Sequence, residues 1–377
     1  MAAGFMCGYD HNQRSVNKGI DPALKKANDI QRNRQEQLAE KLKLDQQAAR
    51  ATINDLFDRW VSLELSQRKE SSRDELVRAF NKDVLPVIGK MPADDVTKAH
   101  VMNILDNILS RGARRLANRT LSELRQMFGF GYTRDIIKTD PTHRLSKADI
   151  GGKETQRDRV LSEAEIRLLT IKIPEAGLHP ATECAIWIML ATGCRIGDLM
   201  KATWDEIDQE ARTWVFSPEK DQTHIKRTHT VYLSDFAWRQ FERLRDYNGG
   251  GQWLYPNREV TAPVCKKSVT KQIGDRQRTK APLSGRSRLV DSLVLPGGNW
   301  TPHDLRRTCV TVMVELGVSG DVAHLCTYHI EQDVIKRTYN RAKQVEAQKQ
   351  AWKLLGDRLE ILTSGNIDNV VLLRQAS

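Results

Sequence analysis

The chain has 377 residues and a mass of 42.9 kDa, enough for two or three domains with cores of their own. Its mean hydropathy is -0.53 and 40% of its residues are hydrophobic, which is typical of a soluble globular protein and excludes a disordered chain. No apolar run is long enough to span a membrane, and the first ten residues lack the pattern of a secretory signal. We therefore expect a cytoplasmic protein without a membrane partner.

The net charge of the chain indicates what kind of partner it binds. Lysine and arginine together number 59 against 48 acidic residues, so the net charge is +11 and the pI is about 9.4. Such a protein most often binds a polyanion, usually nucleic acid, although an enzyme that is merely basic remains an alternative. The six cysteines are scattered without a paired motif, which indicates reduced and mostly buried thiols.

The N-terminal half is predicted to be helical. Residues 1–50 form a polar arm whose one helix is too polar to build a core and must dock on DNA, a partner or another domain. Residues 51–140 carry four apolar segments with helical spacing, which predicts a small helical domain broken near Pro86 and Gly89. Residues 141–158 have almost no apolar periodicity and are predicted to be a linker.

The second half, residues 159–362, is predicted to be mainly helical with one hairpin. A capping box at Ser162 begins it, and an apolar helix over 181–191 ends at Gly193. Two short strands near 214–216 and 229–233 are joined by a polar loop, so the fold class is mainly α with a small antiparallel sheet (α+β). Pro302 after Thr301 begins a further helix.

Two clusters of basic residues are candidates for binding backbone phosphates. An ordinary solvated helix face is the alternative for the first cluster, and the second gains weight from its position beside the motifs described next. The first cluster consists of Arg111, Arg114, Arg115, Arg119 and Arg125, and the second, within residues 266–288, includes Lys271, Arg276, Arg278 and Lys280.

Three stretches carry residues capable of chemistry. Arg195 follows the end of an apolar helix, and Asp198 shares its helical face, which alone indicates only a helix-terminal salt bridge. His303 and Arg306 share a face of the first turn of a helix, where free N–H groups and the helix dipole favour an anion, unless this is an ordinary capped helix. The third stretch holds His329 and Tyr339, each of which taken alone indicates a structural residue.

Taken together, the three stretches resemble the tyrosine recombinase family, and phage and genomic-island integrases in particular. The resemblance lies in the order Arg195, His303-x-x-Arg306, His329, Tyr339 and in the flanking words around each, including Trp204-Asp-Glu-Ile-Asp208. It covers roughly residues 50–362 and is strongest over 160–345.

The resemblance implies a site-specific recombinase that needs no cofactor and no metal. Arg195 and Arg306 would hold the scissile phosphate, and His303 and His329 would hydrogen-bond to it. Tyr339 would be the nucleophile, forming a 3′-phosphotyrosyl bond and freeing a 5′-hydroxyl. Asp198 would orient Arg195 or a neighbouring histidine.

The chain departs from the family pattern at the lysine that should protonate the leaving 5′-oxygen. The position at which the family usually has this lysine is occupied here by His224, so Lys226 is the preferred candidate and Lys220 the other. The interval between His329 and Tyr339 is one residue longer than expected, and residues 1–50 are too few for a complete arm-type DNA-binding domain.

The resemblance also implies an assembly. Residues 51–140 would be the core-binding domain and residues 159–362 the catalytic domain, together forming a C-shaped clamp around duplex DNA. Four protomers would act on synapsed sites in the bacterial nucleoid, with accessory DNA-bending proteins as further partners. The tail, residues 363–377, would pack on a neighbouring protomer or else be a frayed end.

Other activities remain open at this point. A type IB topoisomerase-like enzyme or a resolvase would use the same residues, and a catalytically silent DNA-binding regulator would keep only the fold. A metal site built from His303, His324, Cys326 and His329 has spacing that is not usual for zinc.

Overall fold

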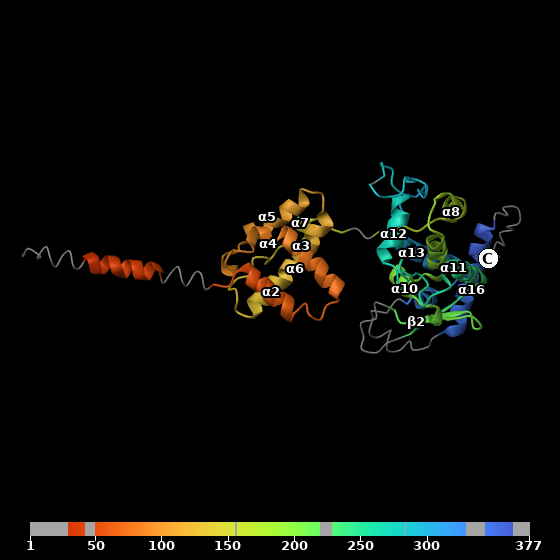
Figure 1. The fold of residues 1–377 in the computed structure, drawn as a ribbon, viewed down its shortest axis with the longest axis horizontal. Coiled ribbons are helices and arrows are strands. Elements are labelled where there is room, and N and C mark those ends of the chain that lie inside the picture. The colour runs from red at the N-terminus through yellow and green to blue at the C-terminus, as the bar shows by residue number, and fades with distance from the viewer. Residues whose placement is uncertain are drawn as a thin grey trace, which may run out of the picture. The chain divides into compact units, whose positions relative to one another are not determined.

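The computed structural model describes residues 29–41, 50–154, 157–218, 228–282, 284–328 and 344–364. The chain divides into two compact units, Met1–Gln156 and Arg157–Ser377, each with its own hydrophobic core (Figure 1). Residues 29–41 form a helix with every residue exposed, as the polar composition of this segment predicts. In the described residues no helix is long and apolar enough to cross a membrane.

The first unit is helical, as predicted. Its core is formed by the apolar faces of the four predicted helical segments. Within this core Phe57 stacks on Phe80, with the ring centroids 5.0 Å apart. The predicted break near Pro86 and Gly89 is present: one helix ends at Asp83, and a short helix with Pro86 in its first turn ends with Gly89 as its C-cap. The helices are α2 (Ile53–Leu63), α3 (Glu70–Asp83), α4 (Leu85–Ile88), η1 (Ala93–Asp95), α5 (Lys98–Leu109), α6 (Arg114–Thr133) and α7 (Lys147–Ile150).

The predicted linker over 141–158 is corrected by the structure. Its residues up to 154 belong to the first unit, where Leu145 and Ile150 are buried in the core. Asn118 of α6 binds this segment on both sides, accepting from the Gly151 N–H at 3.0 Å and donating to the Gly152 carbonyl at 3.2 Å. Two apolar residues and one buried amide therefore fix a stretch whose glycines and charges indicated an open linker.

The second unit is mainly helical with a three-stranded antiparallel sheet, which confirms the predicted fold class. Its helices are α8 (Glu163–Glu175), α9 (Pro180–Thr192), α10 (Ile196–Lys201), η2 (Trp204–Glu206), α11 (Asp235–Asn248), α12 (Lys266–Asp275), α13 (Pro302–Glu315), α14 (Gly320–Cys326) and α16 (Val345–Thr363). Its strands are β1 (Ile207–Asp208), β2 (Thr213–Phe216) and β3 (His229–Tyr232).

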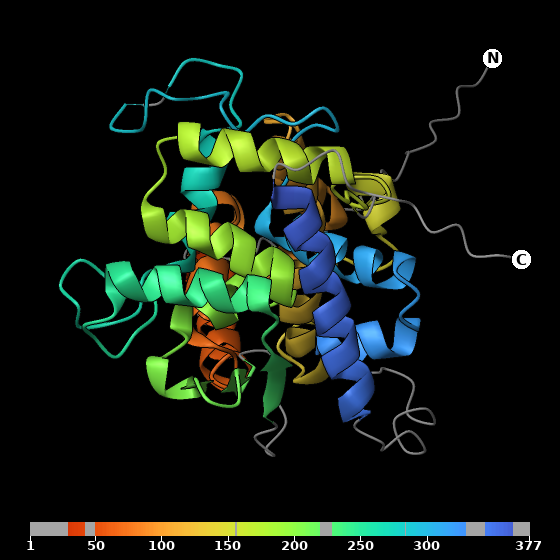
Figure 2. The same ribbon diagram turned by 90° about the vertical axis from the view of Figure 1, so that its right-hand side faces the viewer.

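Helix α9 is the centre of this unit. It is apolar on all sides, and α11, α13 and α16 pack against it; Figure 2 shows α16, in blue, beside the green helices. Gly193 ends α9 in the left-handed conformation (φ +58°), and a Cβ there would lie 2.8 Å from the Sγ of Cys309 and the Cγ2 of Thr327. Because α9 ends sharply at Gly193, Arg195 follows it by two residues and is the N-cap of the next helix.

The predicted hairpin is present. Strands β2 and β3 are antiparallel, with Phe216 opposite His229 and Thr213 opposite Tyr232. The third strand, β1, was not predicted because its two residues are too few to show a period of two. The loop between β2 and β3 lies mostly outside the described residues.

Candidate active site

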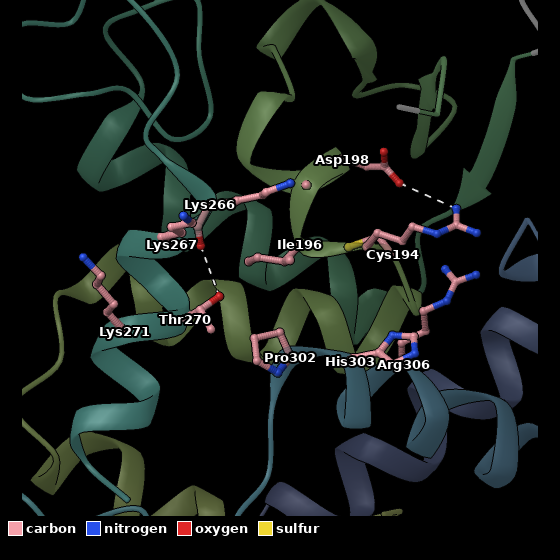
Figure 3. Close-up of a pocket in the computed structure, with 12 residues that line it drawn as sticks. Cys194, Ile196, Asp198, Lys266, Lys267, Thr270, Lys271, Pro302, His303 and Arg306 are labelled. Carbon is pink, nitrogen blue, oxygen red and sulfur yellow. Dashed lines mark hydrogen bonds and ion pairs between the residues drawn. The ribbon is translucent and has the colours of Figure 1, made fainter. Parts of the chain in front are cut away.

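Two arginines from distant parts of the chain line one open pocket. Arg195 is the N-cap of α10, immediately after the end of α9, and Arg306 lies in the first half of α13. Both line a pocket of about 520 Å³, together with His303 from the turn before Arg306. Figure 3 shows His303 and Arg306 side by side. The fold therefore brings together three of the residues that the sequence singled out.

Arg306 is buried and held by main-chain oxygens. Its side chain is 3% exposed, its Nη1 donates to the Gly193 carbonyl at 2.5 Å, and its Nη2 donates to the carbonyl of Thr327. Burial, and after it the nearby positive charge of Arg195, lower the pKa of Arg306 to about 10. The guanidinium is still protonated at neutral pH, and an anion between the two arginines would relieve their repulsion.

Arg195 is fixed from two sides. Its Nη2 donates to the Tyr328 carbonyl at 3.2 Å, and its Nη1 lies 3.9 Å from the Oδ2 of Asp198, the contact drawn in Figure 3. The carboxylate of Asp198 is buried, so the pair is less exposed to solvent than a surface salt bridge. Asp198 therefore lies beside Arg195, as the spacing of three residues predicted.

The start of α13 corrects one expectation. The helix begins with a capping box in which the Asp304 carboxylate accepts from the N–H and hydroxyl of Thr301, at 2.9 and 2.8 Å. Asp304 is fully buried and also binds Arg157 and Arg307, at 3.0 and 2.7 Å. A negative carboxylate already occupies the first turn, so the groups that would attract an anion into the pocket are the arginine and histidine side chains rather than the helix dipole.

Lysines of α12 line the side of the pocket opposite α13. Lys266, Lys267 and Lys271 are exposed and lie on this one helix, as Figure 3 shows. The basic stretch that the sequence placed near the motifs therefore contributes directly to the pocket. An extended polyanion bound there would meet the lysines first and the arginines at the bottom.

The sequence matches two known families in succession. Residues 53–148 match the phage integrase central domain, and residues 159–345 match the phage integrase family. The chain belongs to the phage integrase family of tyrosine recombinases. As a member of that family, the protein is a site-specific recombinase.

Individual relatives of the recombinase agree with this. It is 22% identical to prophage integrase IntA of Escherichia coli (strain K12) over 88% of this chain and 76% of the relative. A lambda integrase tetramer bound to a Holliday junction has a TM-score of 0.61 at 15% identity, covering 84% of this chain and 86% of that one. The Tn1549 transposon integrase in complex with transposon right end DNA has a TM-score of 0.58 at 18% identity, covering 80% of this chain and 98% of that one. At these identities the structural likenesses establish the fold.

Several predicted site residues of the recombinase lie outside the described residues. They are His329, Tyr339 and the candidate lysines Lys226 and Lys220, together with His224. Their roles stay predictions from the sequence. The metal hypothesis meets the same limit, since His329 was one of its four ligands; within the described residues no group of three or more His, Cys, Asp or Glu side chains could hold a metal ion.

The predicted DNA contacts of the recombinase divide into two groups. Arg111, in the turn before α6, is exposed, as are Arg114, Arg115 and Arg119 in the first turns of that helix. Arg125 and Arg278 are half-buried, and Lys271 and Lys280 are exposed. Arg276 is different, because it is 7% exposed and donates to the carbonyls of Ala176 and Gly177 at 3.0 and 2.7 Å. We therefore remove Arg276 from the predicted DNA surface.

One residue near the site escaped the sequence analysis. His229, the first residue of β3, lines a small cavity together with Arg195 and Arg306. Its Nε2 lies 3.0 Å from the Cys326 carbonyl. Burial lowers the pKa of His229 to about 4, although the contact with Cys326 acts to raise it. The only signal was a histidine at an inward position of a short strand, which is weak on its own.

Proposed function

We propose that this recombinase cleaves and rejoins duplex DNA at specific sites, and so integrates and excises a mobile element. The observation that carries the proposal is the convergence of Arg195, Arg306 and His303 on one pocket, with both guanidiniums fixed by main-chain carbonyls. The names of the relatives agree: one is a prophage integrase and another a transposon integrase.

The two arginines are proposed to bind the non-bridging oxygens of the scissile phosphate. Phosphoryl transfer builds up negative charge on these oxygens, and donors fixed in advance stabilise that charge without reorganising. The hydrogen bonds to the carbonyls of Gly193 and Thr327 use two of the five N–H groups of Arg306 and set the plane of its guanidinium. His303, exposed at the edge of the pocket, would donate a further bond to the phosphate.

Tyr339 is proposed to attack the phosphorus through its hydroxyl oxygen. The bond between phosphorus and the 5′-oxygen breaks, a 3′-phosphotyrosyl bond forms, and the leaving oxygen takes a proton, for which Lys226 is the proposed donor. A tyrosine hydroxyl with an ordinary pKa near 10 is a weak nucleophile, so neighbouring cations and His303 must assist its deprotonation. The 5′-hydroxyl of a second strand then reverses the same step.

The proposed partner is double-stranded DNA, bound by both units. The first unit is proposed as the core-binding domain, with Arg114, Arg115 and Arg119 against backbone phosphates, and the second as the catalytic domain. Lambda integrase is known as a tetramer on a Holliday junction, and we propose the same assembly here. DNA-bending partners, a location at the nucleoid and packing of residues 363–377 on a neighbour belong to the same proposal.

The test is covalent trapping on DNA. A library of nicked duplexes with randomised sequence is incubated with the protein, and adducts that survive denaturation are recovered and sequenced. We expect one enriched site and no adduct from Tyr339→Phe. Adduct formation that persists in Tyr339→Phe would contradict the assignment of the nucleophile, and a protein that forms no adduct at all would be the silent regulator.

Strand exchange separates recombination from topoisomerase-like chemistry. Two duplexes carrying the recovered site, each with a different label, should yield recombinant products. An enzyme that forms the adduct and relaxes supercoils but yields no recombinants would instead be a type IB topoisomerase-like protein.

Lys271→Ala is expected to weaken DNA binding through loss of one phosphate contact. The affinity should fall at all sequences alike, and the slope of log affinity against log salt should decrease by about 1. Arg276→Met is the matched control, because it removes a cation from the same segment that binds main-chain carbonyls instead of DNA. It should lower the melting temperature and leave the salt slope unchanged; a reversed pattern would return Arg276 to the DNA surface.

A further inference from the structure

The turn that ends α14 supports both arginines of the site. Three consecutive carbonyls in this turn accept hydrogen bonds from three side chains. Tyr328 accepts from Arg195 at 3.2 Å, Thr327 accepts from Arg306, and Cys326 faces the Nε2 of His229 at 3.0 Å. We call residues 326–328 the carbonyl turn. Its main chain sets where the two guanidiniums stand, so whatever fixes the turn also fixes the pocket.

The carbonyl turn needs support because its backbone is not in a favoured conformation. Tyr328 has φ +48°, in the left-handed region that side chains other than glycine rarely adopt. Helix α14 has already ended at Cys326, and the amide of Tyr328 donates back to the carbonyl of Leu325, at 3.1 Å. Thr327 ties the turn back to the carbonyl of Ala323 through its hydroxyl, at 3.1 Å, and the side chains that bind the last carbonyls add to the forces that set their direction.

His229 reaches the carbonyl turn from a different part of the fold. It is 8% exposed on β3, with its ring edge-to-face with Phe216 at 5.6 Å and tilted against Tyr328 at 5.3 Å. A carbonyl can only accept, so the contact with Cys326 requires the proton on Nε2. A phenylalanine would fill the same space between the two rings but would offer no donor.

We propose that His229 is a positioning residue for strand cleavage: its Nε2–H holds the Cys326 carbonyl and, through the carbonyl turn, the guanidiniums of Arg195 and Arg306. The inference rests on the proposed role of these arginines at the scissile phosphate. The histidine touches no substrate and acts only through the backbone. Groups in such supporting positions typically change activity by about 10- to 100-fold when removed.

The test compares a variant without the donor and a variant that keeps it. In His229→Phe the rate of adduct formation at saturating DNA should fall about 10- to 100-fold with the dissociation constant for DNA unchanged. In His229→Gln, whose amide N–H reaches a similar place, most of that rate should return. Equal rates for the two variants, whether both normal or both low, would overturn the proposal.

Val231→Ala controls for loss of packing alone. Val231 is buried on the same strand and the same face as His229 but makes no hydrogen bond to the carbonyl turn through its side chain. It should lower the melting temperature without slowing cleavage. A slow Val231→Ala would mean that any damage to β3 impairs the site, and the specific role of His229 would be lost.

Hydrogen exchange gives a readout that does not need activity. The amides of Thr327 and Tyr328 should exchange faster in His229→Phe than in the unchanged protein, and at the normal rate in His229→Gln. Unchanged exchange in His229→Phe would refute the proposal even if cleavage could not be observed. Absence of an adduct from the unchanged protein, in contrast, would refute the proposed function and leave this measurement to decide the role of His229.

Discussion

Replacing Arg306 by methionine is expected to slow strand cleavage by about 10³-fold while leaving DNA affinity nearly unchanged. The side chain is 3% exposed at the bottom of the pocket, so it adds little to the first contact with DNA. In the proposed mechanism the contribution of Arg306 comes when charge builds up on the scissile phosphate. The measurement is the single-turnover rate of covalent adduct formation on the recovered site, with the dissociation constant measured in parallel.

Two further variants sharpen this expectation. Arg306→Lys keeps the charge but cannot bind two carbonyls and a phosphate with one planar group, so most of the loss should remain. Arg307→Met removes the neighbouring arginine, which binds Asp304 and does not line the pocket, and should cost less than about 10-fold in rate. If Arg306→Met cleaved at the normal rate, or if Arg307→Met were equally slow, the assignment of Arg306 to the phosphate would be wrong.

Much of the fold follows from local signals in the chain. The end of α9 at Gly193 and the start of α13 at Pro302 were both predicted, because a left-handed glycine and a proline in the first turn each depend only on their neighbours in sequence. The linker was predicted wrongly because its burial does not depend on local signals. Leu145 and Ile150 are too far apart to show a period, and they are buried only because the rest of the unit covers them.

Candidate side chains for the site could be named from the sequence, but the main-chain groups that hold them could not. Arg195, His303 and Arg306 could be named as candidates because their residue types and their order resemble the pattern of the family. The carbonyl turn could not, since a main-chain oxygen is the same in every residue and only the fold shows where it points. His229 was missed, and so was the bond between Asp304 and Arg157, because in each case the partner lies far away in the chain.

Asp304→Asn is expected to destabilise the second unit by about 3–5 kcal/mol. The carboxylate is fully buried, caps α13 through Thr301 and lies between the guanidiniums of Arg157 and Arg307. An amide of the same size removes the charge that both cations face and turns a donor toward at least one of them. For a unit of this size the melting temperature should fall by about 10 °C.

Cleavage should suffer as well, because Asp304 anchors the turn of α13 that carries His303 and Arg306. Asp321→Asn makes the same chemical change in the first turn of α14, on an exposed residue, and should cost no more than about 1 kcal/mol. Arg157→Met combined with Asp304→Asn should lose less stability than the sum of the two single changes, because each removes the same ion pair. Strictly additive losses would mean that Arg157 does not hold Asp304, and that the first residue of the second unit is not tied to the helix that carries His303 and Arg306.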